Sequence, residues 1–445
     1  MHDLPDELLL EIFSSLECIR SYEPQYTAFT NKEKERTRQR ENKVRQLTLY
    51  SLCLTSRRFR VIATPILYTS CTSTATWHSS KSLASFHKTI SAPGTGYGLT
   101  TPLANCLRYV ENRFSDHLGN SLEHDSGTVD ATDMLGQHFF LLSDIITKAP
   151  NLQHISVVNI ESGDMPFWRH LIPLEADANT ALATTKIASH GFPKLRTLCI
   201  QIHSLDTFGK LAEDAVWFQH ICTALATVPS LSELRASDIS THDMLTVPSS
   251  GYQNLQRLEL TMCCLNMQEV GTLLHACLDL RHFSCIWSAC YVGEAAFADL
   301  RSGLLQHEKS LRTLVLDMRE MIFDFVSSIY PQPLGSLHSL VALETLVICE
   351  CSLLEPDSWL FTFLGQKSER RVAELLPENI EDLTVLLRND GHSDVNPLDE
   401  APVLWHLIED CNVLLPKLRN VNLEMDHTLS TDRLQAAFND ANIEF

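Results

Sequence analysis

The chain has 445 residues, 44% of them hydrophobic, and a formal net charge of −20 at pH 7. This composition is typical of about two or three folded domains, or of one elongated repeat domain with an attached module. A surface this acidic repels phosphate backbones and anionic lipid headgroups, so neither nucleic acid nor a membrane is an expected partner. The chain has no apolar run near the ~20 residues of a spanning helix and no leader-like opening, which favours a cytoplasmic or nuclear location.

Metal and cofactor sites are not expected. Most of the 14 cysteines, such as Cys199, Cys285 and Cys349, fall in apolar strand-like runs, where a reduced cysteine acts as a small hydrophobe. No CxxC pair and no HExxH motif occurs among them and the 19 histidines. We therefore predict no metal, no cofactor and free, mostly buried thiols.

The opening segment LPDELLLEIFSSL, residues 4–16, predicts a short helix. On a helical projection one broad arc holds Leu8, Leu9, Ile12, Phe13 and Leu16. This is more apolar surface than one packing contact buries.

A charged run, NKEKERTRQRENKVRQL, lies within residues 18–48 and interrupts the apolar pattern. It indicates either a solvated helical extension or flexible insert, which we favour, or a basic patch for nuclear import or an acidic partner. The apolar pattern resumes at Leu47 as two helices, separated at Thr55 and Ser56, whose hydroxyls suit a turn or a helix N-cap. After Pro65 the run ILYTSC is strand-like.

Residues 71–149 carry weaker signals. The run SAPGTGYGLTTP reads as an ordinary loop, because no GK[ST] follows that would make it a phosphate loop. The run LANCLRYV predicts a strand, and HFFLLSDIITKAP predicts an amphipathic helix that ends before Pro150.

From residue 150 onward one pattern recurs, apolar-x-x-apolar-x-small-or-apolar. Its nine copies are LQHISV from 152, LRTLCI from 195, LSELRA from 231, LQRLEL from 255, LRHFSC from 280, LRTLVL from 311, LETLVI from 343, IEDLTV from 380 and LRNVNL from 418. Only the middle copies keep the ~20–29-residue period of leucine-rich repeats, so the others carry insertions. Helical runs lie between the copies, such as NMQEVGTLLHACL, with Asn266 and Glu269 placed for a capping box, and EAAFADLRSGLL.

One strand and one helix cannot bury both their apolar faces alone, so neighbouring repeats must stack. We predict a parallel sheet with pattern positions four and six inward and positions three and five on a polar concave face. On that face the charges with a tentative substrate-binding role are Arg235, Arg257, Glu259 and His282. If repeats three and four stack in register, Glu233 lies beside Arg257 and Arg235 beside Glu259. These charges then either neutralise one another or hold a charged ligand, and we favour the first.

The N-terminal motif resembles an F-box protein of the fungal type with a C-terminal leucine-rich-repeat-like domain. The resemblance rests on Leu4, Pro5, Glu7, Leu8, Leu9, Ile12, Phe13 and Leu16, and on LCLTSRRFRVIATPILY from 52 to 68. It implies an α/β chain in which a small all-helical F-box module is followed by an irregular solenoid, with parallel strands inside and helices outside. The expected domains are 1–70 for the module with its charged insertion at about 18–48, 71–149 for a connector and first irregular repeats, and 150–445 for the repeat domain.

The resemblance implies a substrate-receptor subunit of an SCF ubiquitin ligase, bound to a Skp-type adaptor and through it to a cullin. The residues expected at the adaptor are Leu4, Pro5, Leu8, Ile12, Phe13 and Leu52. Such a subunit is not an enzyme, because it only raises the effective concentration of a protein substrate near a conjugating enzyme. The alternatives are a repeat scaffold without ligase association and an enzyme with its site in residues 71–149.

Overall fold

The computed structural model traces the chain through two compact units, Met1–Asp238 and Ile239–Phe445. The described residues are 4–20, 32–74, 77–92, 102–113, 130–158, 166–171, 186–201, 211–240, 245–248, 251–288, 296–321, 334–349, 352, 371–386, 402–424, 432–441 and 443–445. The loop predicted at 91–102 lies mostly outside them. Within the described residues, no helix combines the length and the apolar character needed to cross a membrane.

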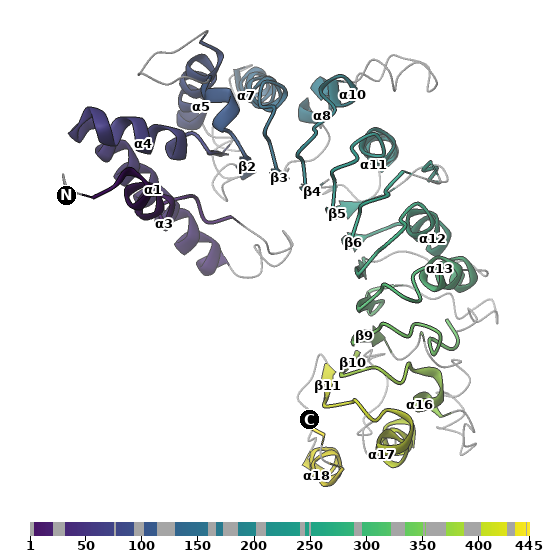
Figure 1. Cartoon of the computed structure of the whole chain (residues 1–445). Helices are drawn as coiled ribbons and strands as arrows, with labels where there is room; N and C mark the ends of the chain where they lie inside the picture. Colours follow the sequence, from purple (N-terminus) through teal and green to yellow (C-terminus); the bar gives the residue numbers. More distant parts are fainter. Residues whose placement is uncertain are drawn as a thin grey trace. The chain divides into compact units, whose positions relative to one another are not determined.

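The described strands form one parallel sheet in which they follow chain order from β1 to β11 (Figure 1). They are β1 (Ser70–Thr74), β2 (Tyr109–Arg113), β3 (His154–Val158), β4 (Thr197–Gln201), β5 (Glu233–Ile239), β6 (Arg257–Cys263), β7 (His282–Trp287), β8 (Thr313–Asp317), β9 (Thr345–Cys349), β10 (Asp382–Leu386) and β11 (Asn420–Glu424). Strands β3 to β11 each begin at the third residue of a predicted copy. The parallel α/β architecture expected from the repeated pattern is therefore confirmed.

Helices lie on one side of the strands within each unit (Figure 1). In the first unit these are α5 (Trp77–Ser91), the short 3-10 helix η2 (Leu103–Cys106), α7 (Asp130–Thr147), α8 (Pro166–Leu171), α10 (Lys186–His190) and α11 (Leu211–Leu225). In the second unit they are α12 (Met267–His275), α13 (Ala296–Leu305), α16 (Val372–Leu375), α17 (Pro402–Leu414) and α18 (Asp432–Asp440).

Within each unit, neighbouring strands are tied together by the same pair of backbone hydrogen bonds. The N–H groups of Gln153 and His154 both donate to the Arg108 carbonyl, at 2.9 and 3.0 Å. One repeat later, the N–H groups of Arg196 and Thr197 both donate to the Gln153 carbonyl, at 2.8 and 3.1 Å. This shared bond pattern fixes the register at which each strand begins.

The core follows the repeated pattern. The first pattern positions are buried in all nine copies: Leu152, Leu195, Leu231, Leu255, Leu280, Leu311, Leu343, Ile380 and Leu418. The fourth positions are buried as well: Ile155, Leu198, Leu234, Leu258, Phe283, Leu314, Leu346, Leu383 and Val421. On β7 and β8 the third and fifth positions are half-buried while the fourth and sixth are buried, as predicted. On β3 to β6 the outward position predicted for the fifth residues is wrong, because all four are buried: Ser156, Cys199, Arg235 and Glu259.

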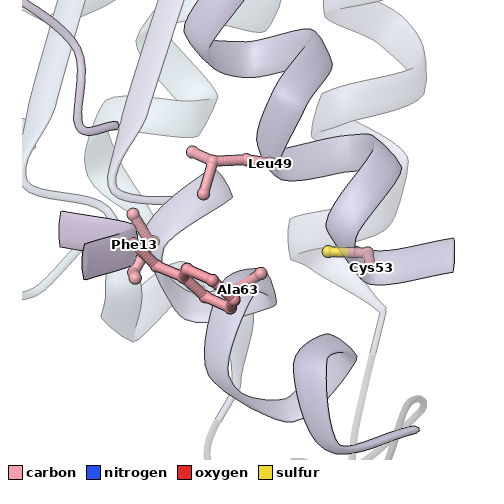
Figure 2. Close-up of a cluster of buried hydrophobic side chains, with 5 residues drawn as sticks. Phe13, Leu49, Cys53 and Ala63 are labelled. Carbon is pink, nitrogen blue, oxygen red and sulfur yellow. The ribbon is translucent and has the colours of Figure 1, made fainter. Parts of the chain in front are cut away.

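Three helices make up the N-terminal module: α1 (Asp6–Ser14), α3 (Lys32–Thr55) and α4 (Arg57–Leu67). Their buried core consists of Phe13, Leu49, Cys53, Ala63 and Ile66. Figure 2 shows that these side chains come from all three helices and meet between them. The turn predicted at Thr55 and Ser56 is confirmed, because the Ser56 hydroxyl caps α4 by accepting from the Phe59 N–H at 3.1 Å.

Two local predictions need correction. Helix α3 is continuous from Lys32 to Thr55, so the charged run and the helix predicted to start at Leu47 are parts of one helix. The strand expected over LANCLRYV begins only at Tyr109, and its first residues, Leu103–Cys106, form η2 instead. Pro102 is the N-cap residue of that helix, and its carbonyl accepts from the Asn105 N–H at 3.0 Å.

Helices α12 and α13 approach each other closely at Gly271. A Cβ atom at this position would lie 2.6 Å from the backbone oxygen of Asp299. The predicted capping box at the start of α12 is also present, with Asn266 and Glu269 each bonding the other's backbone N–H. The close approach therefore occurs on a well-formed helix and requires glycine.

We expect Gly271→Ala to destabilise the protein by about 1–3 kcal/mol, because the added methyl group must push two helix backbones apart. Gly136 on α7 is a matched control, since its added Cβ would meet nothing within 4 Å. Gly136→Ala is expected to be neutral or stabilising by up to about 1 kcal/mol through helix propensity. Urea denaturation measures both, and equal effects at the two positions would contradict the close packing.

Candidate functional site

Helix α1 carries two apolar faces. Leu9 and Phe13 are 1% and 4% exposed and belong to the inner face. Leu8 and Ile12, one turn apart on a different face, are 46% and 52% exposed. The broad apolar arc predicted from the sequence thus divides into a part that packs within the module and a part that faces outward.

The other residues expected at the adaptor take different positions. Leu4 is half-buried, Pro5 is exposed, and Leu52 is half-buried against the module core. Phe13 forms an edge-to-face contact with Phe59, with ring centroids 5.4 Å apart. Phe13 therefore supports α1 from inside the module, and its side chain does not lie on the surface.

Arg58 fixes the start of α1 onto α4. Its guanidinium forms an ion pair with Asp6 at 2.6 Å and donates to the Leu4 carbonyl. This side chain lies in the SRRF run that carries the resemblance. These two contacts hold the N-terminus of α1 against α4, with Pro5 and Leu8 exposed.

Helix α3 has an apolar stripe that the sequence reasoning missed. Its exposed members recur at helical spacing: Val44, Leu47, Tyr50 and Leu54. They lie on a different face of the helix from the core residues Leu49 and Cys53. In the sequence, apolar residues recur every three or four positions on two faces of this helix. A search for one apolar face finds only the one that packs in the core.

The charged half of α3 attaches the segment that follows α1. The Asn42 side chain accepts from the Ile19 N–H at 2.7 Å and donates to the Ile19 carbonyl at 3.0 Å. The Arg45 guanidinium donates to the Ser15 and Glu17 carbonyls, both at 2.9 Å. Of the two forms left open for this run, a solvated helical extension or a flexible insert, the described part from Lys32 onward is helical. Asn42 is buried, however, where the prediction has a solvated face.

A buried ion pair joins α3 to the first strands of the sheet. The Arg38 guanidinium donates to both Glu111 carboxylate oxygens, at 2.6 and 3.1 Å, and the two side chains are 12% and 3% exposed. The Tyr109 hydroxyl donates to the same carboxylate at 2.5 Å. The module is thus anchored to β2 by a charge-assisted, two-point contact.

A small hollow lies beside strands β2 to β5 in the first unit. Its lining is Arg20, Tyr109, His154, Ile155, Ser156, Thr197, Cys199 and Arg235. Arg20 donates to His154 Nε2 at 2.6 Å and lies over the Tyr109 ring, 5.9 Å from its centroid. Burial, with the nearby charges of Arg20 and Arg196, lowers the pKa of His154 to about 4, so its imidazole is neutral near pH 7.

Of the four charges expected to bind substrate, three meet in the second unit. The Glu259 carboxylate is buried, and it accepts from Arg257 Nε at 2.5 Å and lies 3.3 Å from His282 Nε2. The fourth, Arg235, belongs to the hollow of the first unit and pairs with Glu233 at 3.4 Å. Both Arg–Glu pairs join residues two apart on one strand, which the argument from stacked repeats did not anticipate.

A buried polar network lies within residues 71–149, where the alternative hypothesis expects an enzyme site. The Ser73 hydroxyl and His138 Nε2 bond the Asn112 Oδ1 atom, at 3.0 and 2.9 Å. All three side chains are buried. Because both groups donate to the same amide oxygen, the serine and histidine are not arranged as nucleophile and base.

We expect His138 to make stability depend on pH. Burial lowers the pKa of His138 from 6.5 to about 4, so between these values the unfolded chain binds a proton that the folded chain does not. The stability contributed by the neutral imidazole is complete above pH 6.5 and is lost as the pH falls toward 4. The free-energy gap between wild type and His138→Gln in urea denaturation should shrink over this range, and a constant gap would exclude the effect.

Within the described residues, no group of three or more His, Cys, Asp or Glu side chains is arranged to hold a metal ion. No known family model matches the chain, and no curated protein is significantly similar to it.

Proposed function

We propose that this protein is the substrate receptor of an SCF ubiquitin ligase. In this proposal α1 binds a Skp-type adaptor, which links the chain to a cullin, and the repeat domain binds a protein substrate. The chain itself forms no covalent bond and needs no cofactor. Its role is to bring a substrate lysine near the conjugating enzyme, in the cytoplasm or the nucleus.

The observation that carries the proposal is the outward face of α1. Leu8 and Ile12 are about half exposed, although the neighbouring Leu9 and Phe13 are buried. Exposed apolar side chains on one helix face are a feature of protein-binding surfaces, and their burial by a partner drives association. The repeat resemblance adds the usual order of these domains, and we propose that the strand–helix units are irregular leucine-rich repeats.

The concave face supplies the proposed substrate surface. Its charges in the second unit, Arg257, Glu259 and His282, lie together on β6 and β7 and form a polar cluster. A protein segment lying along this face meets the accessible guanidinium of Arg257 and the half-buried imidazole of His282. Such a mixture supports specific recognition of a polar peptide more than of an apolar one.

Co-expression with a Skp-type adaptor, followed by size-exclusion chromatography, tests the proposal. We expect the wild type to co-elute with the adaptor and Leu8→Asp/Ile12→Asp to elute alone. The matched control is Leu278→Asp/Val413→Asp, because both residues are exposed apolar side chains of the second unit. This control should still co-elute. A wild type that elutes without the adaptor would instead favour a repeat scaffold outside the ligase.

A further inference from the structure

The hollow of the first unit contains a cation whose described contacts are uncharged. Arg20 bonds the neutral imidazole of His154 and covers the Tyr109 ring, and it contacts no carboxylate within the described residues. A guanidinium forms stronger hydrogen bonds with an oxyanion than with a neutral acceptor. Arg20 is therefore the side chain that gains most from an anionic ligand.

The rest of the lining is suited to the same ligand. Among the described residues, the lining of the hollow includes a second guanidinium, that of Arg235, and the hydroxyl-bearing Ser156 and Thr197, but no Asp or Glu. Two nearby carboxylates are already engaged, Glu111 by Arg38 and Glu233 by Arg235. Since the whole chain has a net charge of −20, such a positive hollow is a local exception that favours anions.

We propose that this hollow binds a phosphate group, with Arg20 leaving His154 to donate to the phosphate oxygens beside Arg235. The enclosed part of the hollow has room for about one water molecule, so a phosphate group enters only as the Arg20 side chain moves off His154. The group comes either from free phosphate or from a phosphorylated side chain of a protein. If the phosphate belongs to a protein, the hollow is part of the substrate surface of the proposed receptor. This second possibility rests on the proposed function.

Calorimetric titration of the full chain with inorganic phosphate tests the site. We expect Arg20→Gln to weaken phosphate binding about tenfold or more, the value of one charge-assisted hydrogen bond. Arg57→Gln is the matched control, because Arg57 is an exposed arginine of the same unit and does not line the hollow. It should bind phosphate like the wild type. No phosphate binding by the wild type, or equal losses in the two variants, would overturn the proposal.

Further ligands distinguish the sources. A blocked phosphoserine that binds more tightly than inorganic phosphate indicates a protein-borne group, and equal binding indicates free phosphate. A blocked glutamate that binds as tightly as phosphoserine would overturn the choice of phosphate. A second readout on the unmodified protein is the His154 imidazole in an NMR titration, whose pKa should rise when phosphate offsets the charge of Arg20. Adaptor co-elution is measured separately, so failure here leaves the ligase proposal intact.

Discussion

Replacing Arg38 with alanine is expected to destabilise the protein by about 3–5 kcal/mol, the usual loss when one partner of a buried ion pair is removed. The reason is the Glu111 carboxylate, which is 3% exposed and would remain charged in the interior without its guanidinium. Urea denaturation at pH 7 measures the loss directly. The double variant Arg38→Met/Glu111→Leu should recover most of it, because two apolar side chains leave no buried charge.

Arg40 provides the control for this experiment on the same helix. Its ion pair with Glu33 is 3.7 Å long, and both side chains are more than 70% exposed. Exposed pairs of this kind contribute about 0–1 kcal/mol, so Arg40→Ala should change the unfolding midpoint little. If Arg38→Ala lowered the free energy of unfolding no more than Arg40→Ala does, the claim that this ion pair anchors α3 to β2 would be wrong.

Phe13→Ala is expected to destabilise the N-terminal module by about 3–5 kcal/mol through lost packing and the cavity that remains. Phe13 is 4% exposed and contacts core residues from both α3 and α4. Thermal unfolding, monitored by the circular dichroism of the helices, measures this loss of stability. We also expect weaker adaptor binding, since α1 is no longer held with its outward face in place.

Ile12→Ala separates these two effects. Ile12 neighbours Phe13 on the same helix but is about half exposed, so its truncation should cost less than about 1 kcal/mol of stability. It should nevertheless weaken adaptor binding. An Ile12→Ala protein as unstable as Phe13→Ala would mean that the outward face of α1 is part of the module core.

The sequence was a good guide where structure follows a local periodic pattern. All nine repeat strands begin where the pattern predicts, because each copy places its apolar residues at the positions that a stacked strand must bury. The Ser56 cap and the Asn266–Glu269 capping box were predictable for the same reason, since each depends on residues within one helical turn. The predicted start of β2 was wrong because Leu103–Cys106 form the short helix η2 before the strand begins.

The sequence was a poor guide to contacts between distant segments. Nothing in the charged run distinguishes Arg38, which meets Glu111, from the exposed Arg40 two residues later. Arg20 likewise has no periodic neighbour that would place it against His154. For α1, the helical projection predicted the amount of apolar surface. It could not divide that surface between Phe13 inside and Leu8 outside, because the division depends on how α4 packs.

Hydrogen exchange of the full chain, with and without a Skp-type adaptor, tests the central claim most directly. The account predicts that the adaptor slows exchange of backbone amides in α1, where Leu8 and Ile12 face outward, and leaves strands β6–β11 unchanged. Slowed exchange in the repeat strands with none in α1, or no change anywhere at saturating adaptor, would contradict the assignment of α1 as the ligase-binding element.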